Sequence, residues 1–208
     1  AVYFRDANFS ISNCFFKNNK VHIKYSRNLA ESSAVCIEYS NGQLVDCNFI
    51  NNSISSELCS KSRNDGGAVS CSYSDVQILR CNFYKNYISK QGENYDRNDI
   101  SPSGGAIDSA STNLTIDKCN FTDNYAKYGG DITVDAYNSD LIISNCIFIR
   151  KKTSTIKTEM MIYVHETYYN FLFSGNQILI NNLIQIFVFN SYLRNIKCPY
   201  NDNNCLFP

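Results

Sequence analysis

The chain has 208 residues, which is enough for one sizeable hydrophobic core and does not require a second domain. Its 19 basic and 19 acidic residues cancel, so the net charge favours neither a nucleic acid nor an anionic membrane as a partner. No segment reaches the roughly 18 consecutive apolar residues of a membrane span. Even the most apolar stretch, 177–189, is interrupted by Asn181, Asn182 and Gln185.

One short motif, the anchor, recurs along the chain: a cysteine, an aromatic residue two positions later and an asparagine three positions after that. Five copies begin at Cys14, Cys47, Cys81, Cys119 and Cys146, and in the last of these Lys151 replaces the asparagine. A sixth copy without the cysteine covers 176–181, and a degenerate seventh copy covers 198–203. Ala1 already lies inside a repeat, so we expect the sequence to be an excerpt or a mature fragment.

The residues before each anchor alternate in polarity. Apolar residues stand five and three positions before it in the pairs Phe9/Ile11, Val76/Ile78, Leu114/Ile116, Leu141/Ile143 and Phe171/Phe173. Thirteen positions before it, an alanine precedes a β-branched residue in Ala1-Val2, Ala34-Val35, Ala68-Val69 and Ala106-Ile107. In the sixth and seventh copies the equivalent pairs are Tyr163-Val164 and Gln185-Ile186, which keep the β-branched residue but not the alanine. Such alternation predicts short strands, each with one buried face.

Each unit therefore holds two or three short strands separated by turns, without a helical stretch. A parallel strand pair needs a long connection, which the rest of the unit supplies as a coil. We predict an all-β, right-handed parallel β-helix of the pectate-lyase type with about seven coils. It should form one domain over 1–208, with regular repeats over 1–151 and divergent coils or a C-terminal cap over 152–208. The polar segments 53–65 and 87–103 should protrude as loops.

Equivalent side chains of in-register coils should stack, because coils repeat about every 4.8 Å. The phenylalanines would then form one aromatic column: Phe16, Phe49, Phe83, Phe121 and Phe148. The asparagines would hydrogen-bond amide to amide in a second column: Asn19, Asn52, Asn86 and Asn124. Their place after a strand fits a turn in the left-handed region, which asparagine accepts. The Gly-Gly pairs before the next strand fit a sharp corner.

The five anchor cysteines are expected to be buried thiols that act as small hydrophobes. Their parallel Cβ vectors do not present the torsion of about 90° that a disulfide needs. Any disulfide would instead come from Cys36, Cys59 and Cys71, or from Cys198 with Cys205. No Cys-x-x-Cys occurs, and His22 and His165 stand apart from each other and from acidic clusters. Neither a metal nor another cofactor is therefore expected.

Two segments join the Gly-Gly corner to the alanine pair, Gly66-Gly67-Ala68-Val69 and Gly104-Gly105-Ala106-Ile107. Together with the Phe-x-x-Asn anchors, they resemble the repeat of chlamydial polymorphic outer-membrane proteins, and they are similar to surface families of trichomonad-like protists. The resemblance covers 1–151. It implies an extracellular or cell-surface β-helix in adhesion or surface display, with host-cell or matrix proteins or glycans as partners.

Polysaccharide lyases and hydrolases share this architecture, and their sites need several charged residues on one face of successive coils. Asp108 and Asp135 fall on neighbouring coils and could approach each other, although solvated outward positions are the expectation. Arg5 and Glu38 should form a surface ion pair that contributes little. We identify no catalytic residues. A carbohydrate-active enzyme or a glycan-binding module is the alternative to a non-enzymatic surface protein.

Two further sets of residues are candidates for contact with glycans. Tyr39 and Tyr73 share a register eight positions before the anchor, where exposed rings could stack on sugars, which makes them the candidate ligand-binding residues. Four Asn-x-Ser/Thr sequons are candidate glycosylation sites and support secretion: Asn8, Asn51, Asn113 and Asn120. We expect a non-enzymatic surface protein that is adhesive or structural, with its specificity in the loops.

Overall fold

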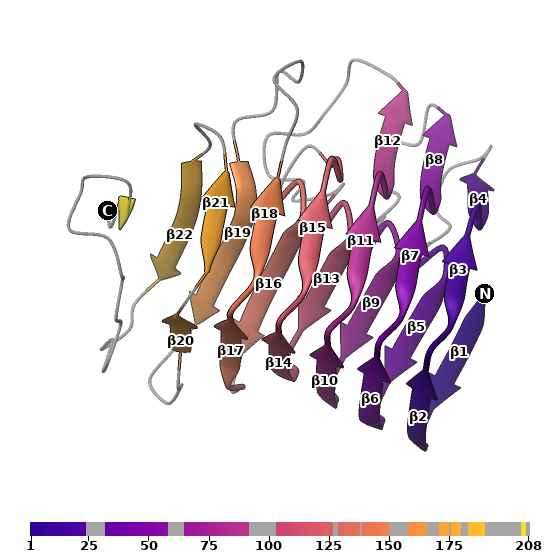
Figure 1. The fold of residues 1–208 in the computed structure, drawn as a ribbon, viewed down its shortest axis with the longest axis horizontal. Helices are drawn as coiled ribbons and strands as arrows, with labels where there is room; N and C mark the ends of the chain where they lie inside the picture. The colour runs from indigo at the N-terminus through magenta and orange to yellow at the C-terminus, as the bar shows by residue number, and fades with distance from the viewer. Residues whose placement is uncertain are drawn as a thin grey trace.

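The computed structural model describes residues 1–23, 32–57, 65–91, 103–126, 129–137, 139–149, 158–165, 171–174, 176–179, 183–189 and 205–206. Within these ranges the chain contains strands and no helix, and the strands pair in parallel. Their stacked sheets wind around one long axis (Figure 1). The predicted parallel β-helix is confirmed.

Four sheets make up the solenoid, and each is built from equivalent strands of successive coils. Sheet A contains β1 (Val2–Arg5), β5 (Val35–Glu38), β9 (Val69–Ser72), β13 (Ile107–Ala110), β16 (Ile132–Tyr137), β19 (Thr158–His165), β22 (Leu183–Phe189) and β23 (Cys205–Leu206). Sheet B contains β2 (Asn8–Ser12), β6 (Asn41–Val45), β10 (Asp75–Leu79), β14 (Asn113–Asp117), β17 (Leu141–Ser144) and β20 (Phe171–Ser174). Sheet C contains β3 (Phe15–Lys17), β7 (Asn48–Ile50), β11 (Asn82–Tyr84), β15 (Asn120–Thr122), β18 (Ile147–Ile149) and β21 (Gln177–Leu179). The short sheet D contains β4 (Lys20–Ile23), β8 (Ser53–Glu57) and β12 (Tyr87–Gln91).

The first six coils each pass through sheets A, B and C in turn, and the first three of them add a strand of sheet D. In Figure 1 the strands of sheets B and C rise on the near side, those of sheet A descend behind them, and the coils advance from the N-terminus at the right. This winding is right-handed, the hand that parallel crossovers strongly favour. The seventh anchor, 198–203, lies outside the described residues.

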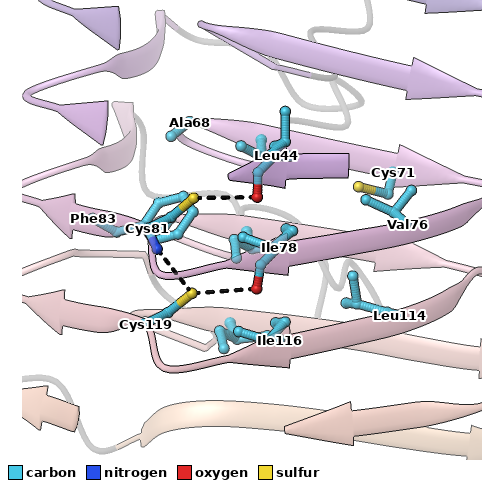
Figure 2. Close-up of a cluster of buried hydrophobic side chains, with 14 of the residues drawn as sticks. Leu44, Ala68, Cys71, Val76, Ile78, Cys81, Phe83, Leu114, Ile116 and Cys119 are labelled. Atoms are coloured by element: carbon cyan, nitrogen blue, oxygen red, sulfur yellow. Dashed lines mark hydrogen bonds between the residues drawn. The ribbon is translucent and has the colours of Figure 1, made fainter. Parts of the chain in front are cut away.

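Alternate side chains of the strands in sheets A, B and C point into the coil and form one core, and sheet D contributes a second, smaller cluster. In β10, Val76 and Ile78 are fully buried, whereas Asp75 and Gln77 are exposed. The register places Ile78 between Leu44 and Ile116, so the same face is buried in coil after coil (Figure 2). Burial of each such side chain contributes roughly 1.5–3 kcal/mol, and this repeated contribution stabilises the stack.

The turns of each coil place a residue in the left-handed region before the chain enters the next sheet. The turn that follows the sheet C strand uses Asn18, Asn51, Lys85 and Asp123 in the first four coils, with φ between 53° and 58°. The prediction that the column asparagines themselves take this conformation is wrong, because it belongs to the residue just before each of them. That residue bends the chain after the sheet C strand and directs the next side chain inward, where Asn86 is fully buried.

Two kinds of glycine are needed at the corner between sheets D and A. Gly66 and Gly104 have φ of +67° and +66°, which L side chains rarely adopt. Gly67 has no such torsion, but a Cβ there would lie 2.0 Å from the carbonyl oxygen of Gly105 in the next coil. The Gly-Gly pair thus combines one unusual torsion with one close approach of stacked backbones.

Two predictions about segment boundaries are wrong. The first residues of the predicted loops 53–65 and 87–103 are strands β8 and β12, whose Ile54 and Ile88 are fully buried with Ile23 and Ala126. A single apolar side chain per coil is enough to specify this short sheet, because it stacks on its equivalents. The remainders of both loops, 58–64 and 92–102, lie outside the described residues.

The register of the later coils also differs from the prediction. Ile132 pairs with Met160, and Met160 pairs with Ile184. A constant spacing to the anchor had predicted Val164 in place of Met160 and Ile186 in place of Ile184. β19 extends over Thr158–His165, twice the length of β13. The spacing from these paired residues to the anchor is therefore longer in the later coils than in the first four.

Candidate functional site

The largest exposed aromatic feature of the described surface lies where sheet A turns into sheet B. We call this cluster the A–B corner and define it as Tyr3, Arg5, Glu38, Tyr39 and Tyr73. Tyr39 and Tyr73 directly follow β5 and β9, and the pairing of Glu38 with Ser72 brings them into one register. Their rings stack with centroids 5.1 Å apart and planes 5° from parallel. They are nevertheless 51% and 59% exposed.

Charged and polar groups lie on the first-coil side of this stack. The Arg5 guanidinium lies over the Tyr39 ring, 5.9 Å from its centroid. The predicted ion pair of Arg5 with Glu38 is present, with Arg5 Nε 4.0 Å from Glu38 Oε2. The Tyr3 hydroxyl donates a hydrogen bond to the same carboxylate. That bond, then partial burial and the charge of Glu38, raises the pKa of Tyr3 above its usual value.

The two tyrosines occupy an unfavourable backbone conformation, with φ of 47° and 50°. An L residue in the left-handed region costs about 1–2 kcal/mol, and a bulky side chain makes it an outlier. Asp6 and Ser111 occupy the same turn in the first and fourth coils with φ of 52° and 50°. Stacking of the two rings returns about 0.5–1.5 kcal/mol. Neither burial nor backbone preference therefore explains tyrosine at this turn.

The two candidate acids do not form a matched pair. Asp108 pairs with Thr133, whereas Asp135 pairs with Ala110, so the carboxylates belong to different columns of sheet A. The two extra residues of this coil follow the start of β16 instead of preceding it, which moves Asp135 along the strand. The expectation that Asp108 is solvated is also wrong, because it is only 6% exposed.

A small polar cluster accounts for the burial of Asp108. The Ser103 hydroxyl oxygen lies 2.9 Å from Asp108 Oδ1 and 3.3 Å from Asp65 Oδ1, and all three side chains are buried. A single hydroxyl has one hydrogen to donate, and the shorter distance assigns that hydrogen to Asp108. Ser103 and Asp65 are joined by a backbone bridge at the D–A corner, so the cluster fastens that corner to β13.

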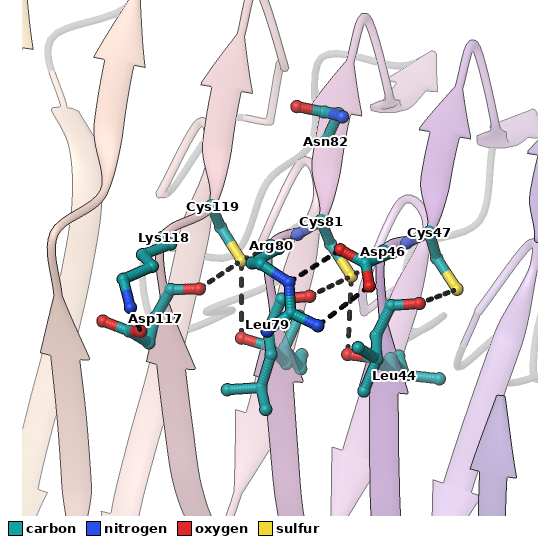
Figure 3. A network of polar contacts seen from close by, with 12 residues as sticks. Leu44, Asp46, Cys47, Leu79, Arg80, Cys81, Asn82, Asp117, Lys118 and Cys119 are labelled. Carbon is teal, nitrogen blue, oxygen red and sulfur yellow. Dashed lines mark hydrogen bonds and ion pairs between the residues drawn. The ribbon is translucent and has the colours of Figure 1, made fainter. Parts of the chain in front are cut away.

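The anchor cysteines of successive coils lie next to one another and form one column of thiols. Cys47, Cys81, Cys119 and Cys146 are buried and Cys14 is half-buried. Each of the first three buried thiols lies 3.3–3.4 Å from the carbonyl oxygen two residues earlier, to which it donates (Figure 3). The Cys81 N–H in turn donates to Cys119 Sγ at 3.3 Å (Figure 2). Burial raises the pKa of Cys119 well above its usual value, which makes it a poor nucleophile.

Cys36 and Cys71, two of the cysteines predicted to form any disulfide, are free thiols. Ile37 pairs with Cys71, so Cys36 and Cys71 point to opposite faces of sheet A and cannot be bridged. Burial raises the pKa of Cys71 strongly, and the charge of Asp108 raises it further. Cys59 and Cys198 lie outside the described residues.

The asparagine column is buried and its amides are bonded on both sides. Asn86 Oδ1 accepts from Asn52 Nδ2 at 2.9 Å, and Asn86 Nδ2 donates to Asn124 Oδ1 at 3.0 Å. At the end of the column farther from the N-terminus, Asn124 Nδ2 donates to Asp131 Oδ1 at 2.8 Å. Asp131 was missed by sequence reasoning, although it stands where earlier coils have alanine, in Gly129-Gly130-Asp131-Ile132.

Sequence reasoning also missed a column of hydroxyl groups. Ser40, Ser74 and Thr112 are buried, and each donates to the carbonyl two residues earlier, at 2.7, 2.7 and 3.0 Å. The Ser40 N–H donates to Ser74 Oγ at 3.1 Å. Their common position seven residues before the anchor was a usable signal, because Ser139 repeats it. The hydroxyls satisfy backbone groups at the start of sheet B.

The surface of the turn from sheet B to sheet C carries a bidentate ion pair. Arg80 Nε and Nη2 each lie 2.8 Å from the Asp46 carboxylate (Figure 3). The hydrogen bond from Arg80 lowers the pKa of Asp46. Both side chains are partly exposed, so the pair contributes little stability, and that contribution is lost as the pH falls through the lowered pKa.

The four sequon asparagines lie on the outside of the coils. Asn8 and Asn113 are exposed and share one column of sheet B, with Asn41 and Asp75 between them. Asn51 Nδ2 donates to Asn18 Oδ1 at 2.8 Å, and Asn120 Nδ2 donates to Asn82 Oδ1 at 2.8 Å. A glycan on Asn51 or Asn120 would therefore compete with a surface hydrogen bond.

The described residues include no group of three or more side chains that could hold a metal ion. Within the same ranges, no helix is long and apolar enough to cross a bilayer.

No protein-family model matches this chain, and neither a curated protein nor a solved structure matches it significantly. Its function must therefore be inferred from the geometry of the chain itself.

Proposed function

We propose that this chain is a non-enzymatic β-helix that acts outside the cell or at a cell surface, in adhesion or surface display. The observation that carries the proposal is where the coils differ in length. In the first coils the variable segments 24–31, 58–64 and 92–102 all join sheet D to sheet A. Sheets B and C keep the same strand lengths in these coils. Sequence that varies on one side of a constant scaffold is typical of binding surfaces.

The chemistry of the interior supports a scaffold. Its columns are phenylalanine, asparagine, hydroxyl and thiol side chains, bonded or packed to their equivalents. The Phe83 ring, for example, lies between those of Phe49 and Phe121, with centroids 4.8 and 4.9 Å away. Burial raises the pKa of the Cys47 and Cys119 thiols, which makes these two poor nucleophiles near neutral pH. The buried groups thus stabilise the stack and leave recognition to the surface.

The experiment compares binding of the parent with that of a variant whose segments 58–64 and 92–102 are replaced by glycine-serine linkers. Fluorescently labelled protein is applied to arrays of matrix proteins and of host-cell surface proteins. We expect the replacement to abolish binding while the far-ultraviolet spectrum stays that of a β protein. The control variant carries Ser10→Ala and Gln77→Ala on the outward face of sheet B and should bind normally.

Two results would overturn the proposal: equal binding by the linker variant, or reproducible cleavage of acidic polysaccharides by the purified protein. The second result would favour the alternative, a carbohydrate-active enzyme. A glycan-binding module is the second candidate function, and the exposed Tyr39–Tyr73 stack specifically favours it.

A further inference from the structure

The two ends of the Tyr39–Tyr73 stack differ. At the first-coil end, the Arg5 guanidinium lies over Tyr39. At the other end comes the fourth coil, where the Tyr73 N–H donates to the Ala110 carbonyl and Ser111 occupies the equivalent turn. Serine carries no ring, so this register supplies no side chain to stack on the outer face of Tyr73. Among the residues that the structure describes, the column of rings thus ends at Tyr73, which is 59% exposed, with one aromatic face open.

We propose that the open face of Tyr73 binds one ring of a neutral pyranose sugar, which takes the place of the next rung. Coils repeat at about 4.8 Å, which is also a favourable separation for stacked rings. A pyranose presents a face of weakly positive C–H groups, and an aromatic ring presents a negative face, so the two attract. The inference goes beyond the proposed surface function, because it adds a ligand class at a surface apart from the variable segments, and it rests on that function for its biological setting.

The strain at the two turns supports a binding role. Both tyrosines have φ near +50°, a region that bulky side chains avoid, and both expose about half of their surface. Folding alone would be served as well by asparagine, which tolerates this conformation. Strained residues that contribute little to the core are found preferentially at functional sites.

The charges around the open face select a neutral sugar. Asp75 is exposed two residues after Tyr73. Its carboxylate would repel a uronate or a sialic acid. Arg5, which could attract one, lies beyond Tyr39 and faces Glu38. A neutral ring avoids the repulsion, and its hydroxyl groups can donate hydrogen bonds to the Asp75 carboxylate.

The level of the fourth coil also leaves room for such a ring. Ser111 has φ of 50°, the same turn geometry as Tyr39 and Tyr73, so its small side chain leaves the corner in their direction. A sugar stacked on Tyr73 would lie alongside Ser111 Oγ, which can donate to a ring hydroxyl. The site therefore combines one stacking face with polar partners at its edge, as sugar-sized sites do.

Saturation-transfer difference NMR with soluble β-linked glucose and galactose oligosaccharides tests the inference, with oligogalacturonate as the acidic comparison. The parent should bind a neutral oligosaccharide more tightly than the acidic one. Tyr73→Asn should weaken that binding by about tenfold or more, because the stacking face is lost. Tyr39→Asn should weaken that binding less, because it removes the ring that stacks on the other face of Tyr73 and leaves the proposed sugar-binding face in place.

Tyr125→Asn is the matched control, because Tyr125 is 42% exposed but lies outside the A–B corner. It should leave sugar binding unchanged, and denaturation midpoints should show that all three variants are folded. Unaltered binding by Tyr73→Asn, or no response of the parent to any neutral oligosaccharide at roughly 10 mM, overturns the inference. A protein that still binds matrix or host-cell surface proteins in that case retains the proposed function, so the two failures are distinguishable.

Discussion

Asn86 and Asn124, 38 residues apart in sequence, are joined by an amide hydrogen bond of 3.0 Å in the buried interior. Asn86 also donates to the Phe49 carbonyl at 2.9 Å and accepts from Asn52 on the opposite side. Every polar atom of this side chain is thus used, and each bond crosses from one coil to another. The column connects the coils in the way that a strand ladder connects backbones.

Asn86→Asp should destabilise the protein by about 2–4 kcal/mol at neutral pH. The carboxylate would face the acceptors Asn124 Oδ1 and Phe49 O without water, so its folded pKa should lie above the unfolded value. The penalty is then present above that raised pKa and shrinks as the pH falls through it, because a protonated acid donates again. Denaturation midpoints at pH 7 and pH 4 measure both effects.

Asn82→Asp is the matched control for this prediction, since Asn82 is exposed and donates to Asn48 Oδ1 at 3.0 Å on the outside of the same coil. Its cost should stay within about 1 kcal/mol. Equal and small effects at the two positions would mean that the Asn86 column is solvated, contrary to its burial in the structure.

Gly67→Ala should cost about 3 kcal/mol or more, because the added Cβ would lie 2.0 Å from the Gly105 carbonyl oxygen. That oxygen belongs to the backbone of the next coil and cannot rotate away. Ser10→Ala, at an exposed position of β2, should change stability by less than about 0.5 kcal/mol. Urea denaturation of both variants checks the prediction, and an unchanged midpoint for Gly67→Ala would show that the stacked corner is loosely packed.

The buried anchor thiols should resist alkylation in the native protein. Iodoacetamide at pH 8 should label Cys36 and Cys14, which are partly exposed, well before Cys47 and Cys119. Burial keeps reagent away from the latter pair and raises the pKa of both, so little thiolate forms. Peptide mapping by mass spectrometry after timed labelling provides the order. Rapid labelling of Cys119 without denaturant would contradict the buried column.

Tyr73→Asn should change stability by less than about 1 kcal/mol in either direction, and thus separate stability from sugar binding. The variant loses the stack with Tyr39, about 0.5–1.5 kcal/mol, and gains a similar amount because asparagine accepts φ near +50°. Thermal denaturation measures the balance. A loss of several kcal/mol would show that the tyrosine is needed for folding, and would remove the strain argument for a binding role.

The features that repeat at constant spacing were predictable from sequence. The anchors placed Phe49, Phe83 and Phe121 in one column, and the strand register has them there. The alanine pairs likewise placed Val35 and Val69 opposite each other. Such positions are specified locally, because each coil must bury the same face against its neighbours.

Features that depend on nonlocal contacts were not predictable. Asp108 reads as a surface residue in its own strand, and only Ser103, from beyond the corner, shows why it is buried. Sheet D escaped notice because Ile54 is an isolated apolar residue in a polar segment, without the alternation that marks a strand. The Tyr39–Tyr73 register was visible in the sequence, but the left-handed torsions and the open face of Tyr73 are properties of the folded chain.

The central structural claim is that coils stack in this register through the buried asparagines, and a double-mutant cycle tests it most directly. Asn86→Ala, Asn124→Ala and the double variant are compared by chemical denaturation, alongside the same cycle for Asn52 and Asn124. Adjacent rungs share a hydrogen bond, so the first pair should show a coupling energy of about 1 kcal/mol or more. Asn52 and Asn124 are separated by Asn86, and their coupling should be less than about half of that. Additive effects for Asn86 and Asn124 would contradict the stacked column.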